Sequence, residues 1–115
     1  MAKQYRSKRV ADVIQVALAE ILQRDVKDFR FGMVTVTQVT VAHDLSYAKV
    51  YVSVLEEEKA TDTIKALNNA AKYLRTSLAS AVKLRATPEL KFIYDDSSVR
   101  GSRIISLIND ALDKK

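Results

Sequence analysis

The residues best suited to chemistry in this 115-residue chain are the basic side chains between Thr63 and Pro88. This segment contains no aspartate or glutamate, whereas an ordinary solvated helix mixes both signs of charge. On a straight helix, four of its cations fall within an arc of roughly 80°: Lys65, Lys72, Arg75 and Lys83. We therefore predict a face that binds the phosphates of a polyanion. The alternative is a solvated surface whose charge only keeps the protein in solution.

A second basic block lies near the start of the chain and also lacks acidic residues. It consists of Lys3, Arg6, Lys8 and Arg9, at the N-terminal end of a predicted helix. Positive charge at a helix N-terminus opposes the helix dipole, which favours anions there. The block therefore either meets an external anion or forms a solvated tail, with residues 1–6 expected to be flexible.

Candidate catalytic and metal-binding residues are few. The only histidine, His43, stands beside Asp44, but there is no cysteine and no second histidine to complete a site. Asp95 and Asp96 precede serines at a predicted strand-to-helix junction, where capping is the expected role. The two glycines cannot form a phosphate-binding loop. We predict a protein that is not an enzyme, with no metal and no cofactor.

Composition narrows the class of protein further. Hydrophobic residues make up 48% of the chain, enough for one domain over residues 1–115 to bury a core. No apolar run approaches the ~20 residues that a membrane span needs, so we expect a soluble, cytoplasmic protein. The net charge of +5 favours nucleic acid as partner. No sustained heptads occur, and a monomer is expected. Tyr51 and Tyr73 could stack on bases, although packing within a strand or helix is the commoner role.

The first half of the chain predicts a helix and a hairpin. A helix is expected over about 7–26, followed by a connector over 26–32. Two Val- and Thr-rich strands over 33–41 and 48–54 should pair as an antiparallel hairpin. The alternation of valines slips near Thr37 and Gln38, which indicates a bulge. The expected core face of the first helix recurs with helical spacing: Val10, Val13, Ile14, Ala17, Leu18 and Ile21.

The second half predicts one long helix, a strand and a last helix. Pro88 ends the long helix, because the residue before a proline avoids the α region. The small residues Ala79, Ser80 and Ala81 form a patch at which this helix could bend. A strand over 90–94 follows, and then a helix with Arg100 and Arg103 in its first turns. The stripe of the long helix should pack on the sheet: Ile64, Leu67, Ala71, Leu74, Leu78 and Val82.

The expected order is α-β-β-α-β-α, an α+β fold. A right-handed helical crossover should place the third strand parallel to a neighbour. A three-stranded mixed sheet with the helices packed on one face would bury all the apolar stripes.

Several local strings resemble one known family. They are RVADVIQ (9–15), ILQRDVKDFR (21–30), DLSYAKVYVSVL (44–55), LNNAAKYLRTSLASAVKLRATPEL (67–90) and YDDSSVRGSRI (94–104). In this order and spacing they are similar to the ribosome-binding factor A family, bacterial assembly factors of the small ribosomal subunit. YAKVYV and the LR-x-x-PEL-x-F-x-YD string are the most specific.

The resemblance implies a single KH-like domain of type II topology that lacks the GxxG nucleic-acid-binding loop. A helix-kink-helix takes the place of that loop in the family, and here it would fall at Ala79–Ser80–Ala81. The implied function is non-catalytic. Such a factor binds the immature small subunit and ribosomal RNA, and it supports late maturation and processing of the precursor's 5′ end, especially in the cold.

We expect the RNA contacts to be made with phosphates and not with base edges. Two other classes of protein compete with this interpretation. A double-stranded RNA-binding domain has three consecutive strands, which the helix between strands two and three argues against. A small basic protein-interaction module, or an RNA-binding domain whose partner is not the ribosome, is the remaining alternative. The expected RNA-binding residues are Lys72, Arg75, Lys83 and Arg85, with Arg6, Lys8 and Arg9 as a second patch and Arg100 and Arg103 as further candidates.

Overall fold

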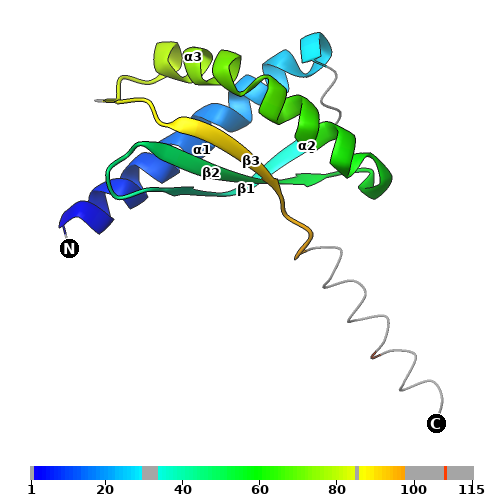
Figure 1. The fold of residues 1–115 in the computed structure, drawn as a ribbon, viewed down its shortest axis with the longest axis horizontal. Helices are drawn as coiled ribbons and strands as arrows, with labels where there is room; N and C mark the ends of the chain where they lie inside the picture. Colours follow the sequence, from blue (N-terminus) through cyan, green and yellow to red (C-terminus); the bar gives the residue numbers. More distant parts are fainter. Residues whose placement is uncertain (1, 30–33, 85, 98–107, 109–115) are drawn as a thin grey trace.

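The computed structural model describes residues 2–29, 34–84, 86–97 and 108. In that part of the chain the helices and strands follow the order α-β-β-α-α-β, with a short 3-10 helix after the second strand (Figure 1). Their bounds are α1 (Ala2–Phe29), β1 (Val34–Val41), β2 (Tyr47–Val54), η1 (Glu57–Lys59), α2 (Ala60–Asn69), α3 (Ala71–Ala81) and β3 (Glu89–Tyr94).

The three strands form one mixed sheet in the order β1-β2-β3. β1 and β2 pair antiparallel, as the hairpin prediction required, and β3 pairs parallel to β2. The register shifts between Val36 and Gln38, so the predicted bulge is confirmed. The Thr37 hydroxyl at the bulge donates to the Asp95 carboxylate at 2.6 Å and also lies 3.2 Å from the Tyr51 carbonyl oxygen. The extra residue therefore ties the bulge to the end of β3.

One face of the sheet carries the hydrophobic core. Three inward side chains of β2, those of Ala48, Val50 and Val52, are fully buried because helices cover this face. Figure 1 shows α2 and α3 following one another along the sheet, with α1 crossing behind it. The opposite face carries the alternate residues of each strand, which are exposed or half-buried. The strand residues of the core are Val36, Val39, Ala48, Val50, Val52, Leu90 and Phe92.

α1 is longer than predicted, and its buried face is rotated. The helix begins at Ala2 and continues to Phe29, so the connector predicted over 26–32 was wrong at its start. Ile14, Leu18 and Ile21 are buried as expected, but Val13 is 42% exposed. Ala11 and Leu22 are buried with the core instead, because α1 packs mainly on β1, the edge strand. The buried face of α1 therefore depends on how its residues fit against β1, and the spacing of apolar residues alone does not predict it.

The long helix is interrupted at Ala70, and the bend predicted at Ala79–Ser80–Ala81 was wrong. Ala70 has φ −91° and ψ 5°, and its N–H is shared between the carbonyl oxygens of Ala66 and Leu67 at 3.0 and 3.1 Å. The three predicted residues continue α3 to Ala81, because alanine and serine are compatible with a helix. At the observed break, two asparagines end α2, and asparagine is a weaker helix former.

α3 ends earlier than Pro88, the residue predicted to stop it. Val82 adopts an extended conformation with φ −132° and ψ 130°. Val82 and Leu84 both pack against the core, while Lys83 between them is exposed. The extended conformation at Val82 lets both apolar side chains reach the core, whereas residues two apart on a continued helix would face different sides. The apolar stripe of the helix pair is otherwise confirmed, since Leu67, Leu74 and Leu78 are fully buried.

The last predicted helix falls almost wholly outside the described residues. Only Ile108 of that segment is described; it is helical and 54% exposed. Within the described ranges, we find no helix with the length and hydrophobicity needed to cross a membrane.

Candidate nucleic-acid interface

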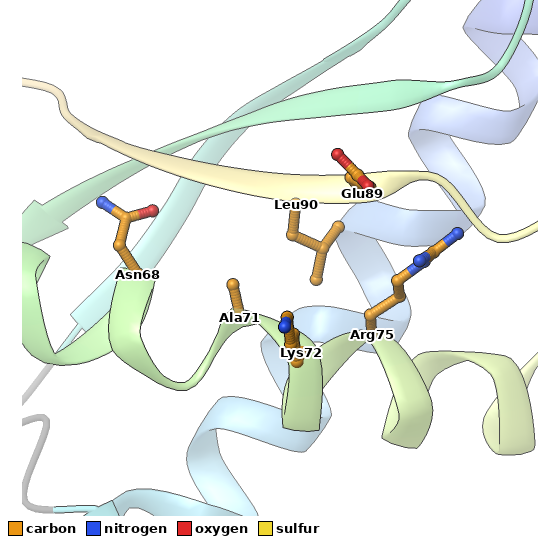
Figure 2. Close-up of a pocket in the computed structure, with 6 residues that line it drawn as sticks. All are labelled: Asn68, Ala71, Lys72, Arg75, Glu89 and Leu90. Carbon is orange, nitrogen blue, oxygen red and sulfur yellow. The ribbon is translucent and has the colours of Figure 1, made fainter.

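A groove lies beside the break between α2 and α3, against the free edge of β3. Figure 2 shows its lining side chains, with Lys72 and Arg75 on the first turns of α3 and Leu90 on the facing strand. The groove encloses about 490 Å³. Among the described residues, its lining is Asn68, Ala71, Lys72, Arg75, Glu89 and Leu90. The break at Ala70 matters here because it turns α3 so that two cations border the strand edge.

Asn68 fixes the helix break against the sheet. Its side-chain amide donates to the Phe92 carbonyl oxygen at 3.1 Å, and its side-chain oxygen accepts from the Phe92 N–H at 2.9 Å. β3 is an edge strand, so the outward backbone groups of Phe92 have no strand partner. Asn68 supplies both bonds that a further strand would make. The side chain therefore closes this end of the groove.

Arg75 has a structural contact at the other end of the groove. Its Nε and Nη2 donate to the Thr87 carbonyl oxygen at 3.0 and 2.8 Å. These bonds hold the segment before β3 against α3, and they occupy donors that a phosphate would otherwise take. The guanidinium still places a positive charge at the groove. As a candidate RNA contact, Arg75 therefore acts through its charge and its remaining donors.

Lys72 is the cation of the groove with the fewest constraints. Its side chain is exposed on α3 and forms no ion pair with a described carboxylate. Glu89 also lines the groove, but Figure 2 shows its carboxylate on the far side of β3 from Lys72. That direction follows from strand alternation, because the next residue, Leu90, faces the helices. Lys72 can therefore meet a phosphate without first separating from an acid.

The structure separates cations that the straight-helix reading grouped on one arc. Lys65 lies on α2, before the break, and Lys83 lies beyond the end of α3, after the extended residue Val82. Lys83 is exposed there. Arg85, like Arg100 and Arg103, lies outside the described residues. The prediction that these cations share one arc of a straight helix was thus wrong. The described cations are nevertheless exposed, as a binding face requires.

The second basic patch lies on the first turns of α1, where Arg6, Lys8 and Arg9 are exposed. Lys8 borders a hollow between α1 and β1. β1 and β3 are the two edges of the sheet, so Lys8 and Lys72 border opposite edges. The two patches therefore do not join in a single groove.

A carboxylate near the helix break links α1 to α3. Asp25 is buried and accepts from Arg24 Nε at 3.0 Å and Nη2 at 3.4 Å. This pairing with Arg24 lowers the pKa of Asp25, and a hydrogen bond from Tyr73 lowers that pKa further. Tyr73, considered from sequence as a stacking residue, thus directs its hydroxyl to Asp25.

The acidic residues considered for catalysis stabilise turns. Asp44 accepts from the Ser46 N–H at 3.0 Å and from its hydroxyl at 2.7 Å, and these bonds lower the pKa of Asp44. Asp95 bonds Ser97 in the same way, at 3.0 and 2.6 Å, while the helix that it was predicted to cap lies almost wholly outside the described residues. Both carboxylates therefore have local partners.

Two features of the structure were missed from the sequence: the Asn68 contact at the groove, and the pairing of Lys49 with Lys91 on the other face of the sheet. Asn68 could not be recognised, because its partner Phe92 lies 24 positions away. Lys49 and Lys91 appeared as ordinary outward residues of two strands. Their direct pairing depends on the parallel register of β2 and β3, which residue spacing does not reveal.

Comparison with known proteins gives one consistent result. The family model described as "Ribosome-binding factor A" matches residues 6–108. Proteins named ribosome-binding factor A from Shewanella baltica and Shewanella frigidimarina are 49% and 50% identical over 117 aligned residues. Each alignment covers 99% of this chain, and 74% and 82% of the respective relative.

Solved structures agree with this result. The crystal structure of ribosome-binding factor A from Thermus thermophilus has a TM-score of 0.66 and 32% identity, covering 76% of this chain and 94% of that one. A homology model of Thermus thermophilus ribosome binding factor A, fitted into the cryo-EM map of a 30S complex, has a TM-score of 0.61 and 36% identity. That match covers 74% of this chain and 90% of the other. From sequence and structure together, this chain belongs to the ribosome-binding factor A family.

Proposed function

We propose that this protein is a non-catalytic factor that binds the immature small ribosomal subunit, in contact with ribosomal RNA. The observation that carries the proposal is the Thermus thermophilus relative, which shares the fold at 36% identity and was fitted into a map of a 30S complex. The protein acts as a monomer in the cytoplasm. It needs no cofactor, because its work is to bind and release an RNA surface.

The groove beside the helix break is the main RNA-contact site in this proposal. Lys72 binds a phosphate there, Lys83 extends the contact past the end of α3, and Arg75 adds positive charge while holding the Thr87 carbonyl oxygen. Lysine recognises a phosphate as a point charge, so these contacts position the protein without reading sequence. Further phosphate contacts are assigned to Arg6, Lys8, Arg9, Arg85, Arg100 and Arg103.

In this proposal the protein supports late maturation of the small subunit, including processing of the 5′ end of the precursor RNA. The cell needs the protein most in the cold. A binding protein shifts an RNA equilibrium only by the difference in its affinity for the two arrangements. At low temperature, RNA rearranges only slowly out of misfolded helices. A factor that favours the mature arrangement is therefore most valuable there.

Sedimentation of cell extract on a density gradient tests the proposed function. The wild-type protein should travel with free small subunits, and the double variant Lys72→Glu/Lys83→Glu should remain at the top. Lys59→Glu is the control, because Lys59 is also an exposed lysine but pairs with Glu56 at 3.0 Å on η1, away from the groove. If the double variant sediments like the control, the groove is not the contact site.

The salt dependence of binding separates this proposal from a protein-interaction module. Removing one lysine–phosphate contact should reduce the slope of log affinity against log salt by about one. Affinity for purified small subunits should therefore fall steeply with salt, and less steeply for Lys72→Gln. Binding that persists at high salt would favour the protein-interaction module.

A further inference from the structure

The sheet face opposite the helices carries an ordered set of basic and aromatic side chains. Tyr47, Lys49 and Tyr51 alternate along β2 and point away from the core, since Ala48 and Val50 between them are fully buried. β2 is the central strand, so this row lies in the middle of the face. None of the described helices covers it, and Tyr47 is 47% exposed.

Two lysines lie directly opposite each other on this face. Lys49 of β2 and Lys91 of β3 are register partners in the parallel pair. Adjacent strands lie about 4.8 Å apart, and like charges directly opposite destabilise a sheet. Neither lysine forms an ion pair with a described carboxylate. Glu89 is an acid of the same face, two positions before Lys91 and opposite Tyr47. The lysine pair is therefore a site where an external anion would relieve repulsion.

Aromatic rings lie on both sides of the lysine pair. Tyr51 and Ile93 form the next row toward one end of the sheet, and Tyr47 and Glu89 form the row toward the other. On β1, Thr40 lies opposite Lys49, and Gln38 lies opposite Tyr51. An open face with cations between tyrosines provides phosphate contacts and stacking surfaces together. Such a combination suits a nucleic acid whose bases are unpaired.

We propose that this open face, defined by Tyr47, Lys49, Tyr51 and Lys91, binds a single-stranded segment of RNA. A backbone phosphate lies between the two lysines, and bases stack on the tyrosines. An RNA duplex does not fit this role, because its bases are already stacked and paired. The inference rests on the proposed function in taking RNA as the ligand. It assigns a different surface, since the groove at Lys72 lies on the helical side of the sheet.

The test is fluorescence anisotropy of the full chain with a labelled oligouridylate, which has little structure of its own. Lys49→Gln/Lys91→Gln should weaken binding about tenfold and lower the salt slope by about 0.7 for each phosphate contact that the variant no longer makes. Tyr51→Leu should weaken binding by roughly tenfold, whereas Tyr51→Phe, which keeps the ring, should bind like wild type. Lys59→Gln is the charge control and should change neither quantity.

Thermal unfolding of the same variants guards against a simple folding defect. Lys49→Gln/Lys91→Gln removes a repulsive pair, so its melting temperature at low salt should equal or exceed that of wild type. A folded double variant that binds oligouridylate as tightly as wild type would overturn the inference. So would equal binding by Tyr51→Leu and Tyr51→Phe, or competition by polyglutamate as effective as competition by oligouridylate.

The two proposals fail in different ways. If Lys72→Glu/Lys83→Glu leaves the small-subunit fraction while the open-face variants bind oligouridylate normally, the open face is not an RNA site and the proposed function stands. If the wild-type protein itself neither sediments with small subunits nor binds oligouridylate, both proposals fall.

Discussion

Asn68 shows how one side chain can join two parts of a fold. Its amide makes both hydrogen bonds to the Phe92 backbone, in the place of a neighbouring strand. We expect Asn68→Ala to lower the free energy of unfolding by about 1–3 kcal/mol, because it leaves a part-buried donor and acceptor without partners. Urea denaturation measures this change, and hydrogen exchange at the Phe92 amide should become faster.

Asn69→Ala is the matched control for this prediction. Asn69 is exposed at the end of the same helix and makes none of the bonds to β3. Its replacement should change stability by less than about 0.5 kcal/mol. Equal losses of stability in the two variants would mean that the Phe92 contact is not what stabilises the helix break.

Asp25 makes the free energy of unfolding depend on pH in the acidic range. Its pKa lies below the ordinary value of 3.8, mainly because of the hydrogen bond from Arg24. The folded state therefore binds this proton less readily than the unfolded chain. The stabilisation is complete above the unfolded pKa and is lost as pH falls through the folded pKa.

Urea unfolding at a series of pH values tests this dependence with Asp25→Asn. The variant should lose less stability than wild type as pH falls below 3.8. Asp44 also has a lowered pKa and titrates in both proteins, so only the difference between the two curves reports Asp25. Parallel curves would contradict the assignment.

At the scale of elements, packing against the sheet distinguishes residues of similar hydrophobicity. Leu78 on α3 is fully buried, whereas Val16 on α1 is 64% exposed. Leu78→Ala should cost about 2–5 kcal/mol through reduced burial and the cavity that remains. Val16→Ala should change the free energy of unfolding by less than about 0.5 kcal/mol. Both values come from chemical denaturation, and a cost of several kcal/mol at Val16 would refute the observed orientation of α1.

The elements themselves were largely predictable, and their ends were not. Val and Thr composition indicated β1 and β2, and the slip in alternation located the bulge near Thr37 and Gln38, where Thr37 is the extra residue. The end of α3 at Ala81 was missed because Val82 continues the helical stripe, and the packing of Leu84 against the core beside it is not visible in the sequence. Only their contacts with the core select the extended conformation.

At the scale of the whole molecule, the basic patches lie at separate places on the sheet. Lys8 borders the hollow beside β1, and Lys72 borders the groove beside β3. Residues that share no partner usually contribute additively. The double variant Lys8→Gln/Lys72→Gln should therefore weaken binding to small subunits by the product of the two single effects. Equilibrium binding at fixed salt measures this product, and a double variant no weaker than either single one would show that the patches do not contact RNA at the same time.

The fold class, the antiparallel hairpin with a third, parallel strand, and the family could all be predicted from the sequence. Apolar periodicity and family-specific strings are local properties, so they can be read without the tertiary structure. Tertiary structure decided where the helix pair bends, which donors of Arg75 are occupied, and that Lys49 faces Lys91. These features depend on contacts between residues distant in the chain: Asn68 with Phe92, Arg75 with Thr87, and β2 in register with β3. Residue types predict which groups can bind a phosphate, but only packing determines which of them are brought together and left accessible.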